Sequence, residues 1–342
     1  MTVSEQLDVE GEYQNFIRKM KSGGQSRRIA WFSVAATVVI LISASWWLQE
    51  NSLLSKKQEV MPVAEHIVPR RNQAVLITES GEEFVLNASQ GESREVGEGV
   101  RVEYDSLSGI NYNLAEGGVV RYHTLRVPKG AEYKLTLNDG TVVWLNSESE
   151  LRYPTSFVGE KREVFLTGEG FENDWYPKSL RVAHDEKQPF IVVSSDIYTK
   201  VYGTEFNVRS YGDEEVHVTL VQGRVSVKKT EGGSEYTLNP GENARFVERV
   251  PEITKVNVNR YIAWKDGYFY YENESMESIM DDLKRWYDFD VVYVGNRVKD
   301  YRFELWVSRD SEISVITDLL MKTNRVGIKV NGKTLVVSEV VR

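Results

Sequence analysis

The sequence predicts a single transmembrane helix, then a mainly-β domain with a hairpin or solenoid-like arrangement, then a small α+β domain of two β-α-β units. Three observations lead to this prediction. Residues 29–48 form an uncharged apolar run, residues 73–260 place apolar side chains at every second position, and residues 261–342 alternate strand-like with helix-like spacing. The 342-residue chain is long enough for two domains, each with a core of its own, beyond the apolar run.

The apolar run Ile29–Leu48 predicts the transmembrane helix. Its 20 residues would extend about 30 Å as a helix, which matches the hydrocarbon core of a bilayer. Tryptophans lie near both ends of the run, where they favour the headgroup layer, and the concentration of basic residues before the run places the N-terminus in the cytoplasm. The boundary residues are Arg27, Arg28, Trp31, Trp46 and Trp47. A signal peptide cleaved near Ser43 and Ser45 is the alternative, and either reading exports the rest of the chain.

Residues 1–28 are expected to form a cytoplasmic tail that contains a short amphipathic helix. The apolar side chains of Val9, Tyr13, Phe16, Ile17 and Met20 share one face at helical spacing. We interpret this face as a docking surface for a partner, because the opposite face carries both signs of charge. A helix lying on the membrane surface is the alternative. Residues 49–72 lack periodicity and are expected to be a periplasmic linker.

Residues 73–260 are expected to be nearly all β. Two similar hairpins are predicted at residues 74–87 and 133–146, each with a glycine at its turn. The Asp139-Gly140 pair is typical of a primed turn, which needs positive φ at glycine. Further strands are expected at residues 163–166, 190–193, 216–220 and 224–227.

Residues 261–342 predict the α+β domain. Ser275 is placed to cap a helix whose apolar residues share one face, and a second helix repeats this spacing 37 positions later. The predicted faces are Met276, Ile279, Met280, Leu283 and Tyr287 in the first helix and Ile313, Ile316 and Leu320 in the second. Strands at residues 268–271, 291–294, 302–306, 328–330 and 335–337 complete two β-α-β units in one sheet.

Neither a catalytic site, a cofactor site nor a metal site is predicted. The four histidines are widely spaced and are expected at the surface, and there is no cysteine. Gly168-Glu-Gly170 matches only part of a dinucleotide motif, so we interpret it as a turn. A net charge of -9 argues against a nucleic-acid partner. The sequence therefore gives no support for an enzyme.

Ordered motifs over about residues 73–340 resemble the FecR family. The C-terminal part is similar to the short N-terminal domains of secretins and TonB-dependent receptors, in the arrangement found in Bacteroidetes. The positions that carry the resemblance are Gly130, Asp139, Gly140, Trp144, Asn146, Tyr153, Pro154, Gly203, Phe206, Asn207, Gly223, Pro240, Gly241, Trp264, Gly267, Trp286 and Tyr287. The domain boundaries that follow are 1–28, 29–48, 49–72, 73–260 and 261–342.

The resemblance implies an anti-sigma factor in the bacterial inner membrane, with most of the chain in the periplasm. Such a protein relays a signal from an outer-membrane TonB-dependent receptor, the transducer, to an extracytoplasmic-function sigma factor. Tyr13, Phe16, Ile17 and Met20 would then dock the sigma factor.

The chain departs from the family pattern in two places. Asn173–Arg181 is an insertion, expected to be a loop. Residues 1–28 are shorter than the anti-sigma region of relatives, so either the start lies upstream or part of the sigma-binding surface is lost. A membrane-anchored periplasmic module that binds a glycan or a receptor is the alternative function, with Trp175, Tyr176 and Trp306 as candidate contacts.

Overall fold

The computed structural model describes residues 73–87, 92–95, 100–105, 109–114, 119–173, 188–212, 214–247 and 250–340. All of these lie in one compact unit, residues 64–342. The predicted tail, transmembrane helix and linker, and all but the first residue of the predicted Asn173–Arg181 loop, lie outside the described residues. Within the described ranges, no helix is both long and apolar enough to cross a membrane.

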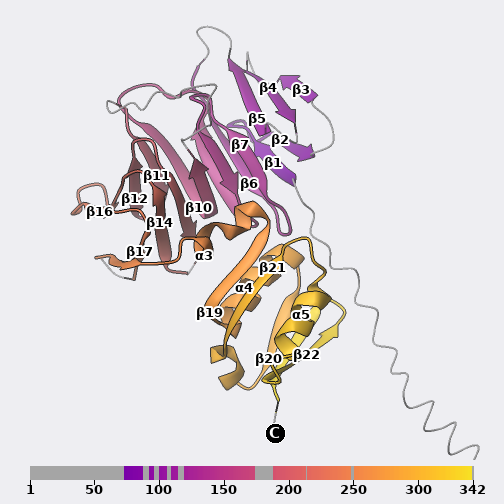
Figure 1. Ribbon diagram of the computed structural model, residues 1–342. Helices are drawn as coiled ribbons and strands as arrows, with labels where there is room; N and C mark the ends of the chain where they lie inside the picture. The colour runs from indigo at the N-terminus through magenta and orange to yellow at the C-terminus, as the bar shows by residue number, and fades with distance from the viewer. Residues whose placement is uncertain are drawn as a thin grey trace, which may run out of the picture. The chain divides into compact units, whose positions relative to one another are not determined.

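The β domain consists of two sheets that share strand β10 (Figure 1). The first sheet has the order β2 (Glu83–Asn87), β1 (Gln73–Ile77), β6 (Tyr122–Val127), β9 (Ser149–Pro154), β10 (Arg162–Asn173), β11 (Phe190–Ser194), β12 (Ile197–Val201), β15 (Val225–Lys229) and β16 (Tyr236–Leu238). The second has the order β7 (Tyr133–Thr136), β8 (Val142–Leu145), β10, β13 (Glu205–Ser210), β14 (Val216–Gln222), β17 (Glu242–Phe246) and β18 (Glu252–Lys255). Strands β3 (Glu92–Glu95), β4 (Val100–Asp105) and β5 (Gly109–Leu114) form a separate antiparallel sheet.

Strand β10 changes sheets at Gly168. Its residues up to Thr167 pair with β9 and β11, and its residues from Gly168 onward pair with β8 and β13. Gly168 has φ +96°, and a Cβ atom there would lie 2.4 Å from Ser149 Oγ and 2.6 Å from Ser149 Cα. Only glycine combines this backbone conformation with so close an approach. The Gly168-Glu-Gly170 segment is therefore part of a strand, and our interpretation of it as a turn was wrong.

Apolar side chains from both sheets form one core. It includes Leu76, Leu125, Leu135, Leu145, Leu151, Phe190, Val218 and Val227, all almost fully buried. Alternate residues along β1, β7 and β11 are buried, as expected for strands with one face on a core. The mainly-β prediction is thus confirmed for the described part of this domain.

Both predicted hairpins are present, β1–β2 and β7–β8, and Gly81 and Gly140 both have positive φ. They do not occupy equivalent places, because β1 joins the first sheet through β6 whereas β8 joins the second through β10.

The turn of the second hairpin differs from the predicted primed type. Leu137 N donates to Thr141 O at 2.8 Å and Gly140 N donates to Leu137 O at 3.0 Å, while Asp139 keeps negative φ. This is a three-residue loop with glycine at the left-handed position. The Asp139 carboxylate accepts from Thr141 N and pairs with Arg162 at 2.8 Å, which stabilises the longer loop.

The C-terminal domain follows the predicted order of elements. It contains β19 (Tyr268–Ser275), α4 (Met276–Tyr287), β20 (Asp290–Val294), η2 (Arg297–Asp300), β21 (Arg302–Ser308), α5 (Ile313–Met321), β22 (Val326–Asn331) and β23 (Thr334–Glu339). Ser275 Oγ accepts from Ser278 N at 3.1 Å, and the predicted apolar faces of both helices are buried. The N-cap and the two helices are therefore confirmed.

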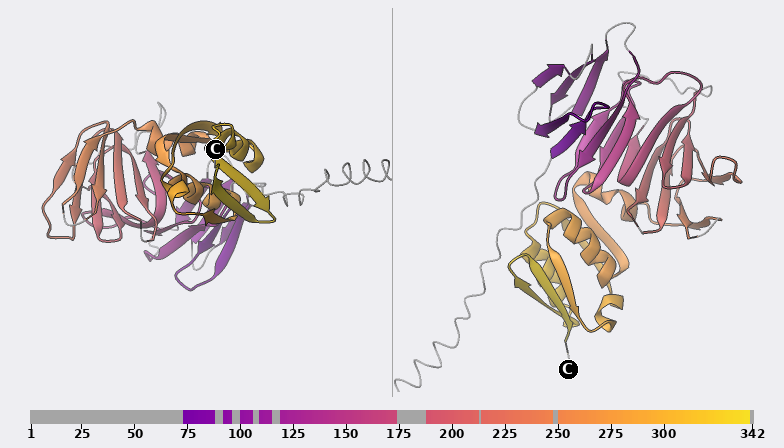
Figure 2. Two further views of the ribbon diagram at one scale, coloured as in Figure 1. Left: turned by 90° about the horizontal axis from the view of Figure 1, so that it is seen from below. Right: turned by 180° about the vertical axis from the view of Figure 1, so that it is seen from behind.

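The strands of the C-terminal domain form two sheets instead of the single predicted one. β19 pairs with β21, whereas β20 pairs in parallel with β23, which also pairs with β22. The strands that flank α4 thus belong to different sheets, and both sheets pack against one apolar cluster. Helix α4 lies behind β19 in Figure 1 and in front of it in the right-hand view of Figure 2.

Candidate functional site

The contact zone between the β domain and the C-terminal domain, here called the junction, combines buried polar side chains with several motif residues. Helix α3 (Asn259–Ile262) and the 3-10 turn η1 (Ala263–Asp266) connect β18 to β19. Ile262 and Trp264 in this connection pack on Phe171 of β10. The Trp264 indole Nε1 donates to Asn207 Oδ1 at 3.2 Å. The connection is therefore attached to the β domain by both apolar contact and a hydrogen bond.

Arg309 extends the C-terminal domain into this zone. It follows β21, and its backbone N donates to Gly267 O at 2.9 Å. Its guanidinium donates to Asn146 Oδ1 at 2.7 Å and to Glu132 Oε2 at 3.0 Å, both in the β domain. The guanidinium carbon lies 3.6 Å from the centre of the Trp286 ring, a cation–π contact, and the side chain is 2 % exposed. Arg309 therefore joins the two domains from a buried position.

Glu169 of β10 is the buried carboxylate on the β-domain side. Asn146 Nδ2 donates to it at 2.8 Å and Asn207 Nδ2 at 3.0 Å, one to each carboxylate oxygen. Arg209 Nη1 lies 3.7 Å from Glu169 Oε2. The same two asparagines that orient Glu169 thus also accept the bonds from Arg309 and Trp264.

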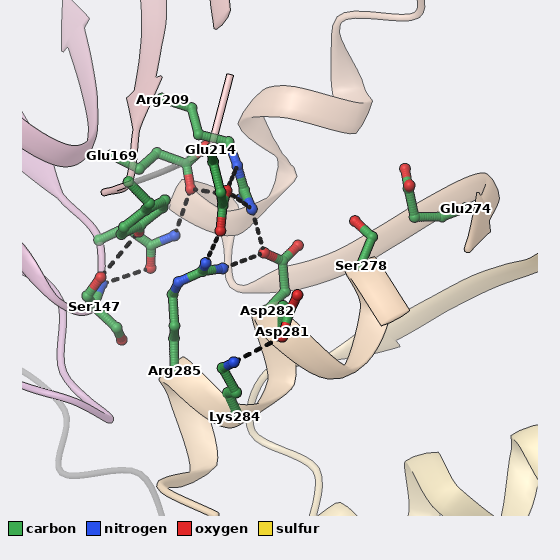
Figure 3. A network of polar contacts seen from close by, with 12 residues as sticks. Ser147, Glu169, Arg209, Glu214, Glu274, Ser278, Asp281, Asp282, Lys284 and Arg285 are labelled. Carbon is green, nitrogen blue, oxygen red and sulfur yellow. Dashed lines mark hydrogen bonds and ion pairs between the residues drawn. The ribbon is translucent and has the colours of Figure 1, made fainter. Parts of the chain in front are cut away.

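Two arginines converge on Asp282 of α4 (Figure 3). Arg209 of β13 donates to Asp282 Oδ1 at 2.8 Å, and Arg285 of α4 donates to the same oxygen at 3.0 Å. Glu214, after β13, accepts from both arginines. The Arg285 guanidinium also lies over the Tyr211 ring, 4.1 Å from its centre. Helix α4 is thereby linked to the β domain by shared charges.

Burial dominates the electrostatics of the junction. Burial raises the pKa of the Glu169 carboxyl above its ordinary value, and the nearby charge of Arg209 opposes this rise. Burial disfavours the charge of Arg209, but the carboxylates of Asp282 and Glu169 outweigh it and hold its pKa well above the usual range. Burial lowers the pKa of Arg309, although a guanidinium remains charged at neutral pH. These groups therefore depend on one another for compensation of their charges across the junction.

Six of the motif residues singled out in the sequence form hydrogen bonds at the junction, and a seventh, Trp144, packs on the apolar cluster of Phe171, Ile262 and Trp264 there. Gly130, Asn146, Asn207, Trp264, Gly267 and Trp286 all contribute a contact there, with Gly130 N donating to Arg285 O at 2.8 Å. They come from five separate segments of the chain. The resemblance thus selected residues that the fold brings together.

The other motif residues have local roles. Tyr153, Pro154, Phe206 and Tyr287 are buried in the two cores. Gly203 and Gly223 approach so closely that a Cβ atom on Gly223 would lie 2.8 Å from Gly203 O. Asp139, Gly140, Pro240 and Gly241 lie in turns. The tail residues Tyr13, Phe16, Ile17 and Met20 and the membrane-boundary residues lie outside the described ranges.

The charged residues of the junction were missed in the sequence. Glu169, Arg209, Asp282 and Arg309 carry no motif spacing, because they approach one another only through the tertiary fold. Glu169 had one signal, a carboxylate between two glycines within a β segment. Among the described residues, no group of three or more His, Cys, Asp or Glu side chains is placed to hold a metal ion.

Comparison with protein families places two FecR domains in this chain. Residues 123–226 match the family described as FecR protein, and residues 268–337 match the family described as FecR, C-terminal. The junction joins these two matched regions.

Two crystal structures from Parabacteroides distasonis ATCC 8503, each described as a "putative anti-sigma factor", are similar to this chain. At 27% identity and a TM-score of 0.56, the first similarity covers 64% of this chain and 99% of that one. The second has 26% identity and a TM-score of 0.57, and covers 64% of this chain and 100% of that one. No curated protein matches the chain.

Proposed function

We propose that the chain is an anti-sigma factor and transmembrane signal transducer. The two FecR domains and the likeness to the Parabacteroides structures support this role. In the proposal the protein lies in the bacterial inner membrane, with its N-terminus in the cytoplasm. It relays a signal from an outer-membrane TonB-dependent receptor, the transducer, to an extracytoplasmic-function sigma factor, and it acts without a cofactor and without catalysis.

The observation that carries the proposal is the junction itself. A relay needs the domain that receives the signal to be mechanically connected to the rest of the chain, and a shared network of buried and half-buried charges across the junction supports such a connection. Such a network has few alternative arrangements that satisfy all its members, so displacing one domain disturbs the other.

The test of the sigma-factor interaction uses the tail. Phe16 and Ile17 lie on the apolar face of the predicted docking helix, and changing both to Asp would place charge on that face. We expect the double variant to lose co-purification with the cognate sigma factor and to change transcription from its reporter. Gln14→Asp together with Asn15→Asp, which adds the same two charges outside the predicted face, is the control. Equal reporter output in the wild type and the double variant would contradict the proposal.

The test of orientation uses the absence of cysteine in the wild type. Single cysteines at Ser4 and at Ser314, an exposed residue of α5, report on the two sides of the membrane. With the outer membrane permeabilised, an impermeant thiol reagent should label only the cysteine at Ser314. Ser149 also follows the predicted transmembrane helix, but it is unsuitable for labelling because the structure buries it against Glu169. Labelling at Ser4 would refute the proposed orientation.

A further inference from the structure

Three aromatic side chains lie together on the outer surface of the β19–β21 sheet. Trp306 of β21 is 64 % exposed and Tyr268 of β19 is 42 % exposed, which is unusual for such large rings. Trp306 stands opposite Tyr270 across the two strands, with ring centres 5.3 Å apart, and lies 5.9 Å from the Tyr268 ring. We call Tyr268, Tyr270 and Trp306 the aromatic face. The other side of the sheet is buried, through Phe269, Tyr271 and Val307.

Two carboxylates border the aromatic face. A β-bulge in β19 places Glu272 and Asn273 opposite Glu304 of β21, and Asn273 has φ +50°. Both carboxylates are exposed, and neither forms an ion pair with any residue that the structure describes. Asn257 and the Tyr270 hydroxyl both donate to Glu272, which fixes its carboxylate beside the ring. Like charges on facing strands destabilise a sheet, and Arg302 on the same face of β21 donates to Asn273 O at 2.8 Å and forms an ion pair with neither carboxylate.

The geometry favours a cation over a sugar. Trp306 is tilted by 82° from Tyr270 and by 76° from Tyr268, so the three rings do not form the flat platform on which a sugar ring would stack. Ring faces at steep angles beside two carboxylates instead suit a cationic group, which is attracted both by the π-electrons and by the negative charge. Large exposed aromatic residues are also the side chains that most often anchor protein–protein contacts.

We propose that the aromatic face, together with Glu272 and Glu304, is a docking surface that receives an arginine or lysine side chain of a partner protein. The charge complementarity of the surface identifies the occupant. This inference rests on the proposed function for the identity of the partner, which is the periplasmic domain of the transducer.

The first experiment tests the surface without any partner. The full chain is labelled with 5-fluorotryptophan in detergent, and the Trp306 resonance is assigned by Trp306→Phe. N-acetyl-arginine amide should shift this resonance saturably, and its neutral isostere N-acetyl-citrulline amide should act at least fivefold more weakly. The Glu272→Gln/Glu304→Gln variant should lose most of the response to the arginine probe. Glu79→Gln, an exposed carboxylate in the β1–β2 turn, is the matched control and should respond as the wild type does. Equal responses to the two probes, or a full response in the double variant, would overturn the inference.

The second experiment separates this inference from the proposed function. The wild type and the variants are titrated with the purified periplasmic domain of the transducer at two salt concentrations. Trp306→Ala should weaken binding at least tenfold, and Glu272→Gln/Glu304→Gln should reduce both affinity and its salt dependence. Tight binding that is unaffected by either variant would refute the docking surface while supporting the relay. A response to the arginine probe without binding of the transducer domain would refute the relay while supporting a site for basic side chains.

Discussion

At the scale of single residues, Arg309 is the side chain on which the junction depends most. It is 2 % exposed, and it satisfies Asn146 and Glu132 in the other domain. Arg309→Met preserves much of the volume but removes the hydrogen bonds to Asn146 and Glu132 and the cation–π contact with Trp286, so we expect a loss of about 3 kcal/mol in the free energy of unfolding. Denaturant unfolding of the full chain measures this loss. Arg302→Met, an exposed arginine in β21, should cost less than about 0.5 kcal/mol, and equal losses would contradict the role of Arg309.

His217 gives a second prediction, which depends on pH. Burial, together with the charges of Arg209 and Arg245, lowers the pKa of His217 to about 4. The unfolded chain, with a histidine pKa near 6.5, therefore takes up the proton first as the pH falls. The contribution to stability is full above pH 6.5 and is lost between pH 6.5 and 4. From pH 7.5 to 5.0 the wild type should lose up to about 2 kcal/mol more than His217→Gln. Parallel pH curves would show that His217 titrates normally.

The histidines also show where residue-level reasoning from the sequence stops. We expected solvated or hydrogen-bonded histidines at the surface. His123 is instead buried in β6, His217 is half-buried and hydrogen-bonds to Asn243, and His66 and His184 lie outside the described residues. A lone histidine in a strand carries no sign of which face it occupies unless the register is known. By contrast, the motif asparagines Asn146 and Asn207 were recognised as important, although nothing in the sequence indicated that they would share Glu169.

At the scale of elements, β10 is the strand that joins the two sheets of the β domain. Gly168→Ala would force a Cβ atom to within 2.4 Å of Ser149 Oγ, at a position with φ +96°. We expect it to destabilise the fold by more than about 3 kcal/mol, beyond the backbone strain alone. Gly81→Ala is the matched control, because Gly81 also has positive φ but has open space around it. It should cost about 1 kcal/mol. Thermal unfolding compares the melting temperatures of the two variants. Similar melting temperatures would show that β10 tolerates a side chain at its bend.

Elements were predicted best where local signals suffice. Helix α4 was found from its apolar spacing and from Ser275, and the β1–β2 and β7–β8 hairpins were found from alternation and glycine. What could not be predicted is which strands pair across long separations. The strands beside α4 belong to different sheets, and β10 belongs to two, because these pairings depend on how the whole core closes.

At the scale of the whole described unit, the junction makes the two domains interdependent. Deleting residues 266–342 would remove Arg309 and Asp282, and with them the partners of Asn146 and Arg209. The strands of the β domain end at Lys255, so the deletion would cut none of them and would act on the β domain through the lost junction contacts. A single substitution that weakens the junction and leaves both apolar cores intact is therefore a better test.

Asp282→Asn is that substitution. The two arginines on Asp282 Oδ1 would lose a full negative charge while the side chain keeps its size. We expect a loss of about 1–3 kcal/mol, because buried guanidiniums are left with less compensation. Asp281→Asn is the matched control on the same helix, since the Asp281 carboxylate pairs with Lys284 within α4, 2.7 Å away. It should cost less than about 0.5 kcal/mol. In calorimetry of the full chain, a junction that couples the domains should give the Asp282 variant a broader or divided unfolding transition, as the C-terminal domain begins to melt on its own. If the Asp282 and Asp281 variants melt alike and as a single transition, the domains are held together by apolar packing around Trp264, and the charged network has another role.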